Sequence, residues 1–559
     1  MPQTTLWTLV LCVSAALAAF TAAAPAQEGR FDPTPEEARA VEAVAESAIR
    51  AHTRFLADDL LEGRGPGSRG DHLTQAYILS QLGTLGLRPG APGGSWLQPV
   101  PLLGVATKVP GSLAFRRDAE GVELRFLEDY IAVSGLGREP AAVRDAEVVF
   151  VGYGIRAPEH GWDDFKGEDL RGKVLLVMNN DPSSSPDLFA GETRLYYGRW
   201  DYKYEEAARH GAAGAIVIHT TPSAGYPWQV VQTSWTGEQF ELRDGKGPRI
   251  AMKSWTTEDA SRRIARLGGK DLDELRRAAE SKSFRPVPLG VKVSVELPVT
   301  CREIESANVL GLLEGSDPDR RGEVVMYTAH HDHLGTETLG EAGEGDRIYN
   351  GAVDNASGVG AMLAIAAGYA RLPKPPARSI LFAAVCAEEQ GLLGSLHLAA
   401  HPTVPPERIA CDLNIDGVNI FGRTRDVTVV GLGKSSLDEL VQAVAAWQGR
   451  AVKGDQFPDR GFFYRSDQFS FAKIGVPGVY LDSGTDFVGR PEGWGKERIE
   501  EWERTRYHQP SDEYDEAWDL GGAVDDARLL FLVGLRAAGA REMPRWRPGD
   551  EFEAARKDR

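Results

Sequence analysis

Beyond Glu323, short apolar segments alternate with stretches of helical periodicity, and this alternation constrains the fold more than any other feature of the sequence. The predicted strands are 324–329, 379–387, 411–415 and 476–481, and the predicted helices are 358–369 and 392–400. Strands that alternate with helices indicate a largely parallel sheet covered on both faces. The expected fold class is therefore α/β, with a mostly parallel mixed sheet flanked by helices.

Polar side chains follow three of these strands at the point where each strand ends. In open α/β sheets, ligands bind at the carboxyl ends of the strands, so such side chains should meet in one crevice. Two further candidates lie in loops, and the complete set is His330, Glu389, Asp416, Asp354 and His508. Each of these residues alone is weak evidence, because a single Asp after a strand is usually a helix cap or a loop residue.

Histidine and carboxylate side chains are suitable ligands for two Zn²⁺ ions. One carboxylate must bridge, because five protein ligands cannot otherwise give each ion three. Three carboxylates neutralise only part of the charge of two divalent cations, and a bridging hydroxide would neutralise the remainder and act as the nucleophile. The adjacent Glu388 and Glu389 need different roles, since successive residues of an extended segment point to opposite sides. One would hold zinc, and the other would be a general base, a role that contributes ~10²- to 10⁴-fold in rate.

At these residues the chain resembles the co-catalytic zinc aminopeptidases of metallopeptidase family twenty-eight, whose superfamily includes glutamate carboxypeptidase and the transferrin receptor. The resemblance spans about Pro33 to Arg541. The motifs that carry it are A-H-x-D at 329–332, NGAVDNASG at 350–358, Glu-Glu at 388–389, N-x-D at 414–416 and Tyr-His at 507–508.

The resemblance implies a role for each of these positions. One zinc would bind His330, Asp354 and Asp416, and the other would bind Asp354, Glu389 and His508. Glu388 would be the general base, Asp332 would orient His330, and Tyr507 would stabilise the tetrahedral intermediate. A cis peptide bond is implied at Asp354-Asn355, whereas His331 and His333 are interpreted as bystanders.

The spacing between the first two motifs departs from that of the shortest family members. His330 and Asp354 lie 24 positions apart, and the additional segment, 336–348, is rich in Gly and Glu. We expect a surface loop near the cleft.

The rest of the chain indicates an interrupted peptidase domain. Its first segment, 33–125, opens with a helix whose N-terminus is capped by Thr34 and Glu37. A β-rich insert follows over 126–289, and the second segment, 290–545, carries the metal site before a charged tail at 546–559. The insert resembles a protease-associated domain at 149–154, 170–174 and 207–212. Such domains cover the cleft or bind substrate segments, but a purely structural insertion fits equally well.

Residues 1–26 have the pattern of a signal peptide. Positions 6–20 are mostly apolar, no charged side chain precedes Glu28, and Ala24-Pro25-Ala26 is a cleavage pattern. We expect a secreted or periplasmic protein that begins near Gln27 and has no stable membrane insertion after cleavage. The alternative is an uncleaved anchor.

Composition excludes one class of partner and leaves two questions open. A net charge of −18 argues against nucleic acid as a partner. The three cysteines after the signal peptide predict neither a disulfide framework nor a zinc knuckle, and a Cys301–Cys411 bridge is only a hypothesis. The oligomeric state does not follow from the sequence.

The expected function is removal of N-terminal residues from peptides or proteins, because a protonated amine is attracted by clustered carboxylates. A glutamate-type carboxypeptidase or dipeptidase would use the same two-zinc site but needs cations for the substrate carboxylates. The strand at 475–480 has none, and Arg465 is the nearest candidate. A glutaminyl cyclase lacks the insert and has Ser where this chain has Asn355. A receptor would have lost its metal ligands, and all five are present here.

Overall fold

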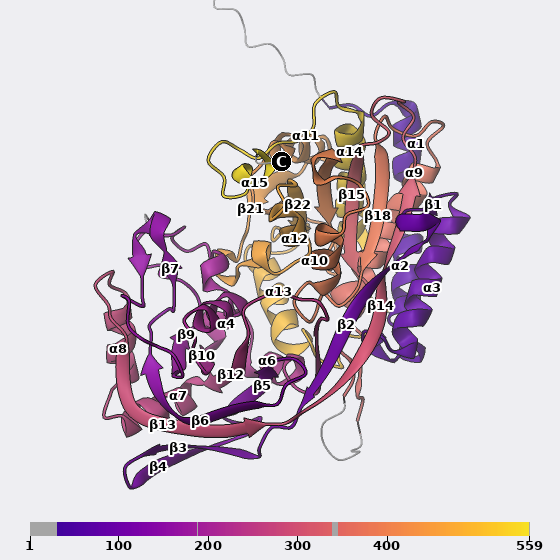
Figure 1. Ribbon diagram of the computed structural model, residues 1–559. Helices are drawn as coiled ribbons and strands as arrows, with labels where there is room; N and C mark the ends of the chain where they lie inside the picture. Colours follow the sequence, from indigo (N-terminus) through magenta and orange to yellow (C-terminus); the bar gives the residue numbers. More distant parts are fainter. Residues whose placement is uncertain (1–30, 187, 338–344, 558–559) are drawn as a thin grey trace, which may run out of the picture.

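A computed structural model describes residues 31–186, 188–337 and 345–557, which form two bodies, each built around its own sheet (Figure 1). The predicted signal peptide lies outside these residues, as does most of the Gly- and Glu-rich loop. No helix within the described ranges is long and apolar enough to cross a membrane.

The first body contains a ten-stranded mixed sheet. Its strand order is β11 (Glu238–Leu242), β2 (Leu97–Thr107), β14 (Val299–Leu313), β18 (Ser379–Val385), β15 (Val324–His330), β19 (Ile409–Asn414), β22 (Gly478–Asp482), β20 (Asp426–Val430) and β21 (Ala451–Gly454), with β1 (Arg88–Pro89) paired to β14. The central strands β18, β15, β19 and β22 are parallel, and antiparallel pairs flank them. The predicted mixed α/β fold is confirmed, with its parallel part at the centre, where the polar strand ends converge.

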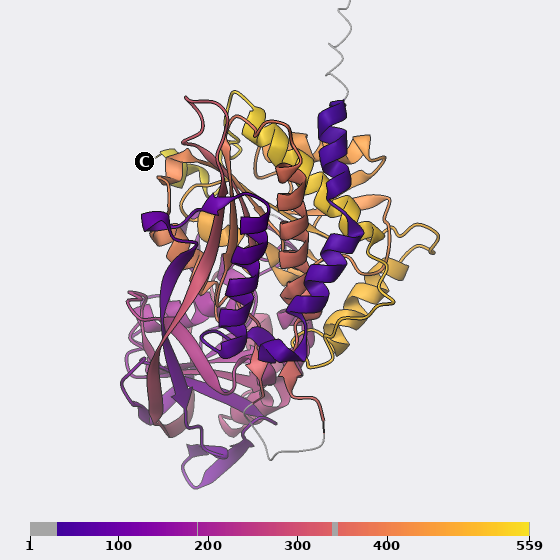
Figure 2. The same ribbon diagram turned by 90° about the vertical axis from the view of Figure 1, so that its right-hand side faces the viewer.

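Helices cover both faces of this sheet. One face packs against α1 (Pro35–Ala43), α2 (Glu46–Leu56), α3 (Arg69–Thr84), α9 (Gly358–Ala370), α11 (Leu437–Trp447) and α14 (Gly521–Gly539), and the other against α10 (Leu393–Ala400) and α12 (Gln468–Ala472). On the first face, α1 and α2 follow one another and α3 stands to one side of them (Figure 2). The predicted cap is present, because Thr34 accepts a hydrogen bond from the backbone of Glu37 and the Glu37 side chain accepts one from the backbone of Thr34.

The second body contains an eight-stranded sheet. Its order is β4 (Glu120–Arg125), β3 (Ser112–Arg117), β13 (Val287–Leu297), β6 (Ala141–Phe150), β9 (Val174–Met178), β10 (Gly214–His219), β12 (Ile250–Thr257) and β5 (Tyr130–Gly135). Helices α7 (Glu258–Leu267) and α8 (Leu272–Ala279) contribute to one hydrophobic core, and α4 (Trp200–Arg209) and α6 (Trp228–Ser234) to another.

This sheet is wider than the predicted insert of 126–289. It begins at Ser112 and ends at Leu297, because β13 is hydrogen-bonded to β6 and β3 rather than to the first body. Conversely, β11 lies within the insert sequence but joins the edge of the first sheet through β2. Alternating apolar residues correctly predict β13 as a half-buried strand, but alternation does not say which sheet a strand joins.

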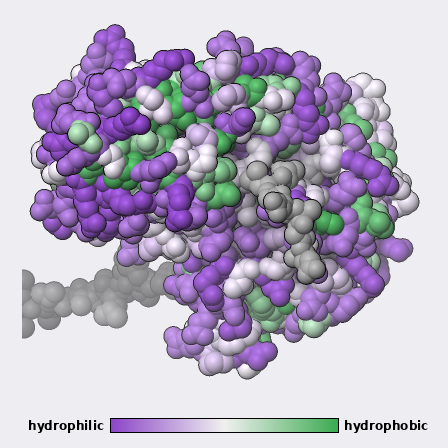
Figure 3. Space-filling model, turned by 90° about the horizontal axis from the view of Figure 1, so that it is seen from below, coloured by the Kyte–Doolittle hydropathy of each residue, from purple (hydrophilic) through white to green (hydrophobic). Residues whose placement is uncertain are grey.

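The long antiparallel strands β2 and β14 connect the two bodies (Figure 1). Seen from below, the surface is mostly hydrophilic (Figure 3), in keeping with a sequence in which 26% of the residues are charged. The three cysteines in the described ranges, Cys301, Cys386 and Cys411, are all free, so the hypothetical Cys301–Cys411 bridge is absent. The remaining α-helices and strands are α5 (Thr221–Ala224), α13 (Trp494–Thr505), α15 (Glu553–Lys557), β7 (Arg156–Ala157), β8 (Trp162–Asp163), β16 (Gly335–Thr336) and β17 (Ile348–Tyr349).

Candidate metal centre

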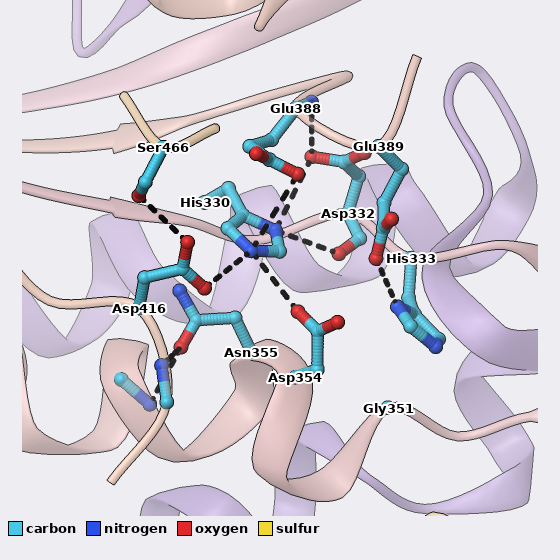
Figure 4. Close-up of polar contacts among 12 residues, drawn as sticks. His330, Asp332, His333, Gly351, Asp354, Asn355, Glu388, Glu389, Asp416 and Ser466 are labelled. Atoms are coloured by element: carbon cyan, nitrogen blue, oxygen red, sulfur yellow. Dashed lines mark hydrogen bonds and ion pairs between the residues drawn. The ribbon is translucent and has the colours of Figure 1, made fainter. Parts of the chain in front are cut away.

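The end of β15 places His330 beside two carboxylates (Figure 4). Its Nε2 lies 3.2 Å from Oδ1 of Asp354 and 3.3 Å from Oδ1 of Asp416. Asp416 follows β19, the parallel neighbour of β15, so the pairing of these strands brings the two residues to the same edge of the sheet. These three side chains form a first triad.

A second triad shares Asp354 with the first. Nε2 of His508 lies 3.3 Å from Oδ2 of Asp354 and 3.0 Å from Oε2 of Glu389, which follows β18. The two oxygens of Asp354 therefore face different histidines. This is the arrangement required of a carboxylate that bridges two cations.

The donor spacing fits zinc. Ligands bound to one tetrahedral Zn²⁺ at ~2.0–2.1 Å lie roughly 3.3 Å from one another. The histidine-to-carboxylate distances in the two triads fall between 3.0 and 3.3 Å. The ligand atoms of His330, Asp354 and Glu389 all lie within 4.8 Å of one another across the two triads. The structure thus brings together all five predicted ligands, and His330, Asp354 and His508 are buried.

Electrostatics in the cleft reflect its excess of carboxylates. Burial disfavours the charged form of His330, but Glu388, Asp354 and Asp416 outweigh it and raise the pKa of His330 well above its usual value. Burial likewise lowers the pKa of His508, but the neighbouring Glu389 and Asp354 outweigh this effect and raise the pKa to about 9. Burial and the neighbouring Asp416 and Glu389 raise the pKa of Glu388, although His330 opposes this. Divalent cations bound among these carboxylates would neutralise their negative charge.

Glu388 borders the first triad without belonging to it. Its Oε2 lies 3.9 Å from Nε2 of His330, and its backbone N–H donates to Oδ1 of Asp332 at 3.0 Å. The chain does not continue as an extended strand here, because β18 ends at Val385 and Ala387 adopts a left-handed φ of 54°. Glu388 and Glu389 do take different positions, but a bend separates them rather than simple strand alternation.

Asp332 contacts His330 in a way that differs from the implied one. Nδ1 of His330 lies 3.3 Å from the backbone carbonyl of Asp332, whereas the carboxylate oxygen is 3.9 Å away. The Asp332 carboxylate instead accepts the Glu388 backbone N–H. It therefore connects the two strand ends that carry His330 and Glu388.

The histidines interpreted as bystanders are structural partners. Nδ1 of His333 bonds to Oε1 of Glu389, the oxygen that does not face His508. His331 is buried and its Nε2 lies 3.0 Å from Oδ1 of Asp71. His333 therefore helps to orient a candidate ligand. Its position in the sequence does not by itself indicate this role.

Three further side chains that the sequence analysis missed position the candidate ligands. Ser466 donates to Oδ2 of Asp416 at 2.6 Å. Asp512 accepts the backbone N–H groups of Val353 and Asp354. Arg64 donates to four backbone carbonyls around the same loops. None belongs to a recognisable motif, and only the folded chain brings them to the site.

Asn355 links the Asp354 loop to the Asp416 loop. Its Oδ1 accepts the backbone N–H of Gly417 at 2.9 Å, and its Nδ2 donates to the carbonyl of Ile415 at 3.0 Å. The peptide bond between Asp354 and Asn355 is cis, as the resemblance implies.

A cavity of about 180 Å³ opens beside the two triads. Asp354, Glu388 and Asp416 line it, and Arg465 and Tyr507 also contribute. Its apolar walls come from Ile415, Val418, Ile420, Phe421, Leu481, Trp502 and Leu530. Nη2 of Arg465 donates to the hydroxyl of Tyr507 at 3.0 Å, and burial raises the pKa of that hydroxyl well above its usual value.

Comparisons with known proteins agree with this geometry. Residues 308–531 match the family model described as Peptidase family M28, a stretch that includes all five clustered residues. The chain is similar to Aminopeptidase NAALADL1 of Mus musculus, with 34% identity over 142 residues, which are 24% of this chain and 16% of that protein. It is also similar to a probable zinc metalloprotease of Pyrenophora teres f. teres (strain 0-1), with 34% identity over 149 residues, which are 26% of this chain and 29% of that protein. The matches thus span less than a third of either relative.

Among solved structures, the fold is similar to that of the aminopeptidase from Aneurinibacillus sp. strain AM-1. The identity is 18%, the TM-score is 0.53, and the alignment covers 92% of this chain and 97% of that chain. This likeness supports the α/β fold with large mixed sheets.

Proposed function

We propose that this chain, which carries a peptidase family M28 domain over residues 308–531, is a zinc metallo-aminopeptidase that removes N-terminal residues from peptides. The observation that carries the proposal is the pair of triads that share Asp354. One histidine faces each oxygen of this carboxylate, at 3.2 and 3.3 Å, and a further carboxylate completes each triad. Such a donor set suits two Zn²⁺ ions with room for water and substrate.

When bound, the zinc ions would polarise the scissile carbonyl and lower the pKa of a water molecule. The side chains of the chain itself would transfer the proton and stabilise the developing charge. Glu388 would accept the proton of the attacking water on its carboxylate and then transfer it to the departing amine. Its Oε2 lies 3.9 Å from Nε2 of His330, at the border of the first triad, where such a water would be within reach.

Tyr507 would donate a hydrogen bond to the carbonyl oxygen as negative charge develops there. Its hydroxyl already accepts a hydrogen bond from Arg465, which leaves its own hydrogen available and makes it a better donor. Removal of one such donor costs about 2.7–4 kcal/mol of transition-state stabilisation.

The charges around the cavity favour a substrate with a free amine. Asp354, Glu388 and Asp416 line it, whereas Arg465 is the only cationic side chain among the described residues in its wall. The guanidinium of Arg465 is bound to Tyr507 and lies 5.3 Å from the ring centre of Tyr226. A carboxypeptidase or dipeptidase would have to bind the substrate carboxylate at Arg465, where several nearby carboxylates would repel it.

The test is a peptide library in which each sequence is present with a free and with an acetylated N-terminus. Mass spectrometry should show that free peptides shorten from the front while acetylated peptides persist. Glu388→Gln protein serves as the control for contaminating peptidases. Shortening from the carboxyl end, or equal cleavage of both sets, would contradict the aminopeptidase proposal.

We also propose that the chain is exported and that residues 1–26 are removed, so that the mature protein is secreted or periplasmic. The apolar run and the cleavage pattern before Gln27 support this. N-terminal sequencing of natively produced protein should begin near Gln27, and an intact Met1 would contradict the proposal.

A further inference from the structure

The second body contacts one of the candidate zinc ligands directly through the side chain of Ser234. Ser234 is the last residue of α6, and its Oγ lies 2.7 Å from Nδ1 of His508. The two residues are 274 positions apart in the chain. We propose that Ser234 is a positioning residue that fixes His508 for metal binding, so that the second body completes the metal centre; this rests on the proposed zinc site.

The chemistry of the imidazole ring explains why this contact matters. Nε2 of His508 faces Asp354 and Glu389, so a cation held by this triad would take the Nε2 lone pair. In a neutral imidazole the hydrogen is then on Nδ1, which must act as a donor. Oγ of Ser234 accepts that hydrogen bond and thereby fixes both the tautomer and the orientation of the ring.

The two histidines of the centre differ in where this support comes from. Nδ1 of His330 contacts the carbonyl of Asp332, which belongs to the same strand end. His508 depends on a hydroxyl from the other body. The triad that contains His508 is therefore the one that should respond when α6 is altered.

Helix α6 is rigidly attached to the second body. Nε1 of Trp228 and Nε2 of Gln232 both donate to the carbonyl of Leu127, at 2.7 and 2.9 Å. Val230 and Val231 are buried in the core of that body. Packing thus fixes the helix and the position of Ser234 at its end.

A second contact supports the same contribution of this body. Tyr226, which precedes α6, lies against the guanidinium of Arg465, and Arg465 donates to the hydroxyl of Tyr507. The segment around α6 therefore supports both adjacent residues, His508 and Tyr507. Tyr507 carries the proposed hydrogen-bond donor to the oxyanion. The inserted body contributes to the site rather than only covering it.

The experiment measures zinc binding, not activity. Metal-free wild-type, Ser234→Ala and Thr233→Ala proteins are titrated with Zn²⁺ in competition with a coloured chelator. Ser234→Ala should bind one zinc with ~10- to 100-fold lower affinity and the other as the wild type does. Thr233→Ala should match the wild type, because the Thr233 hydroxyl bonds only to carbonyls of its own helix in this structure. Ser234→Thr, which keeps a hydroxyl, should recover much of the loss.

Two outcomes would overturn the role of Ser234. The first is equal affinity of Ser234→Ala and wild-type protein at both sites. The second is a metal-free Ser234→Ala protein that melts well below metal-free Thr233→Ala, because its zinc loss would then reflect unfolding. If wild-type protein binds no zinc at all, the proposed function itself fails, which distinguishes the two hypotheses.

Discussion

Arg64 should be the residue outside the proposed ligand set whose loss most disturbs the loops of the candidate metal centre. It is fully buried, and its guanidinium donates to four backbone carbonyls. Nε reaches His331 at 2.9 Å, Nη1 reaches Leu56 and Asn350 at 2.5 Å each, and Nη2 reaches Gly351 at 2.9 Å. One side chain thus holds together the end of α2, the segment after β15 and the loop before Asp354.

The expected cost of Arg64→Met follows from these contacts. Methionine keeps an apolar stem of similar length but has no donor, so four buried carbonyls lose a partner. An unpaired buried acceptor costs about 1–3 kcal/mol. Two effects reduce the total: water can enter the space, and the buried charge is itself unfavourable, as shown by the pKa of Arg64, which burial lowers to about 10. We therefore expect a net loss of ~3–5 kcal/mol, the range for breaking a buried charged network.

The loss should be measured on metal-free protein, so that zinc binding does not add to the stability. Hydrogen–deuterium exchange of the peptides around 329–335 and 349–358 should be faster in Arg64→Met by on the order of 10²- to 10⁴-fold, and the urea midpoint should fall. Arg69→Met is the matched control, because the Arg69 side chain is 72% exposed and its nearest acid, Glu62, is 3.6 Å away. Its effect should stay within about 0.5 kcal/mol. Equal exchange in the two variants would refute the reasoning.

Three further predictions concern the centre itself. Dialysis against a strong chelator should abolish peptidase activity and added zinc should restore it, whereas full activity without metal would contradict the metal-dependent proposal. Glu389→Ala should lose one zinc, while Glu388→Ala should keep both and lose turnover by ~10²- to 10⁴-fold; metal analysis of the purified variants decides this, and loss of metal from Glu388→Ala would reverse the assignment. Tyr507→Phe should lower kcat on the order of 10²- to 10³-fold with little change in KM or zinc content. An effect confined to KM would instead place Tyr507 in ground-state binding.

The sequence predicted the central sheet and the convergence of the ligands because both follow from local patterns. Apolar strands such as 324–329 lie within one or two residues of their observed bounds. Parallel neighbours such as β15 and β19 end at the same edge, so His330 and Asp416 had to meet once the order of the strands brought them together.

The parts that could not be predicted depend on contacts between distant segments. Ser234 and Arg64 lie in no motif, and their partners are hydrogen-bonded atoms that only the folded chain brings close. The true extent of the second sheet was missed for the same reason, because the pairing of β13 with β6 is a long-range choice. His333 was interpreted as a bystander, whereas in the folded chain its ring contacts Glu389.

The loop before α9 shows how tightly its surroundings hold Asp354, the proposed bridging carboxylate. Gly351 has a left-handed φ of 52°, and a Cβ there would lie 2.2 Å from the carbonyl oxygen of Asp354 and 2.5 Å from the His333 ring. No other residue fits without displacing one of these neighbours. On its other side the loop is held by Asn355 and by Asp512, which accepts the Asp354 N–H at 3.1 Å. Asp354 can therefore present one oxygen to each histidine because buried contacts from both sides prevent its loop from relaxing away from the negative charge around it.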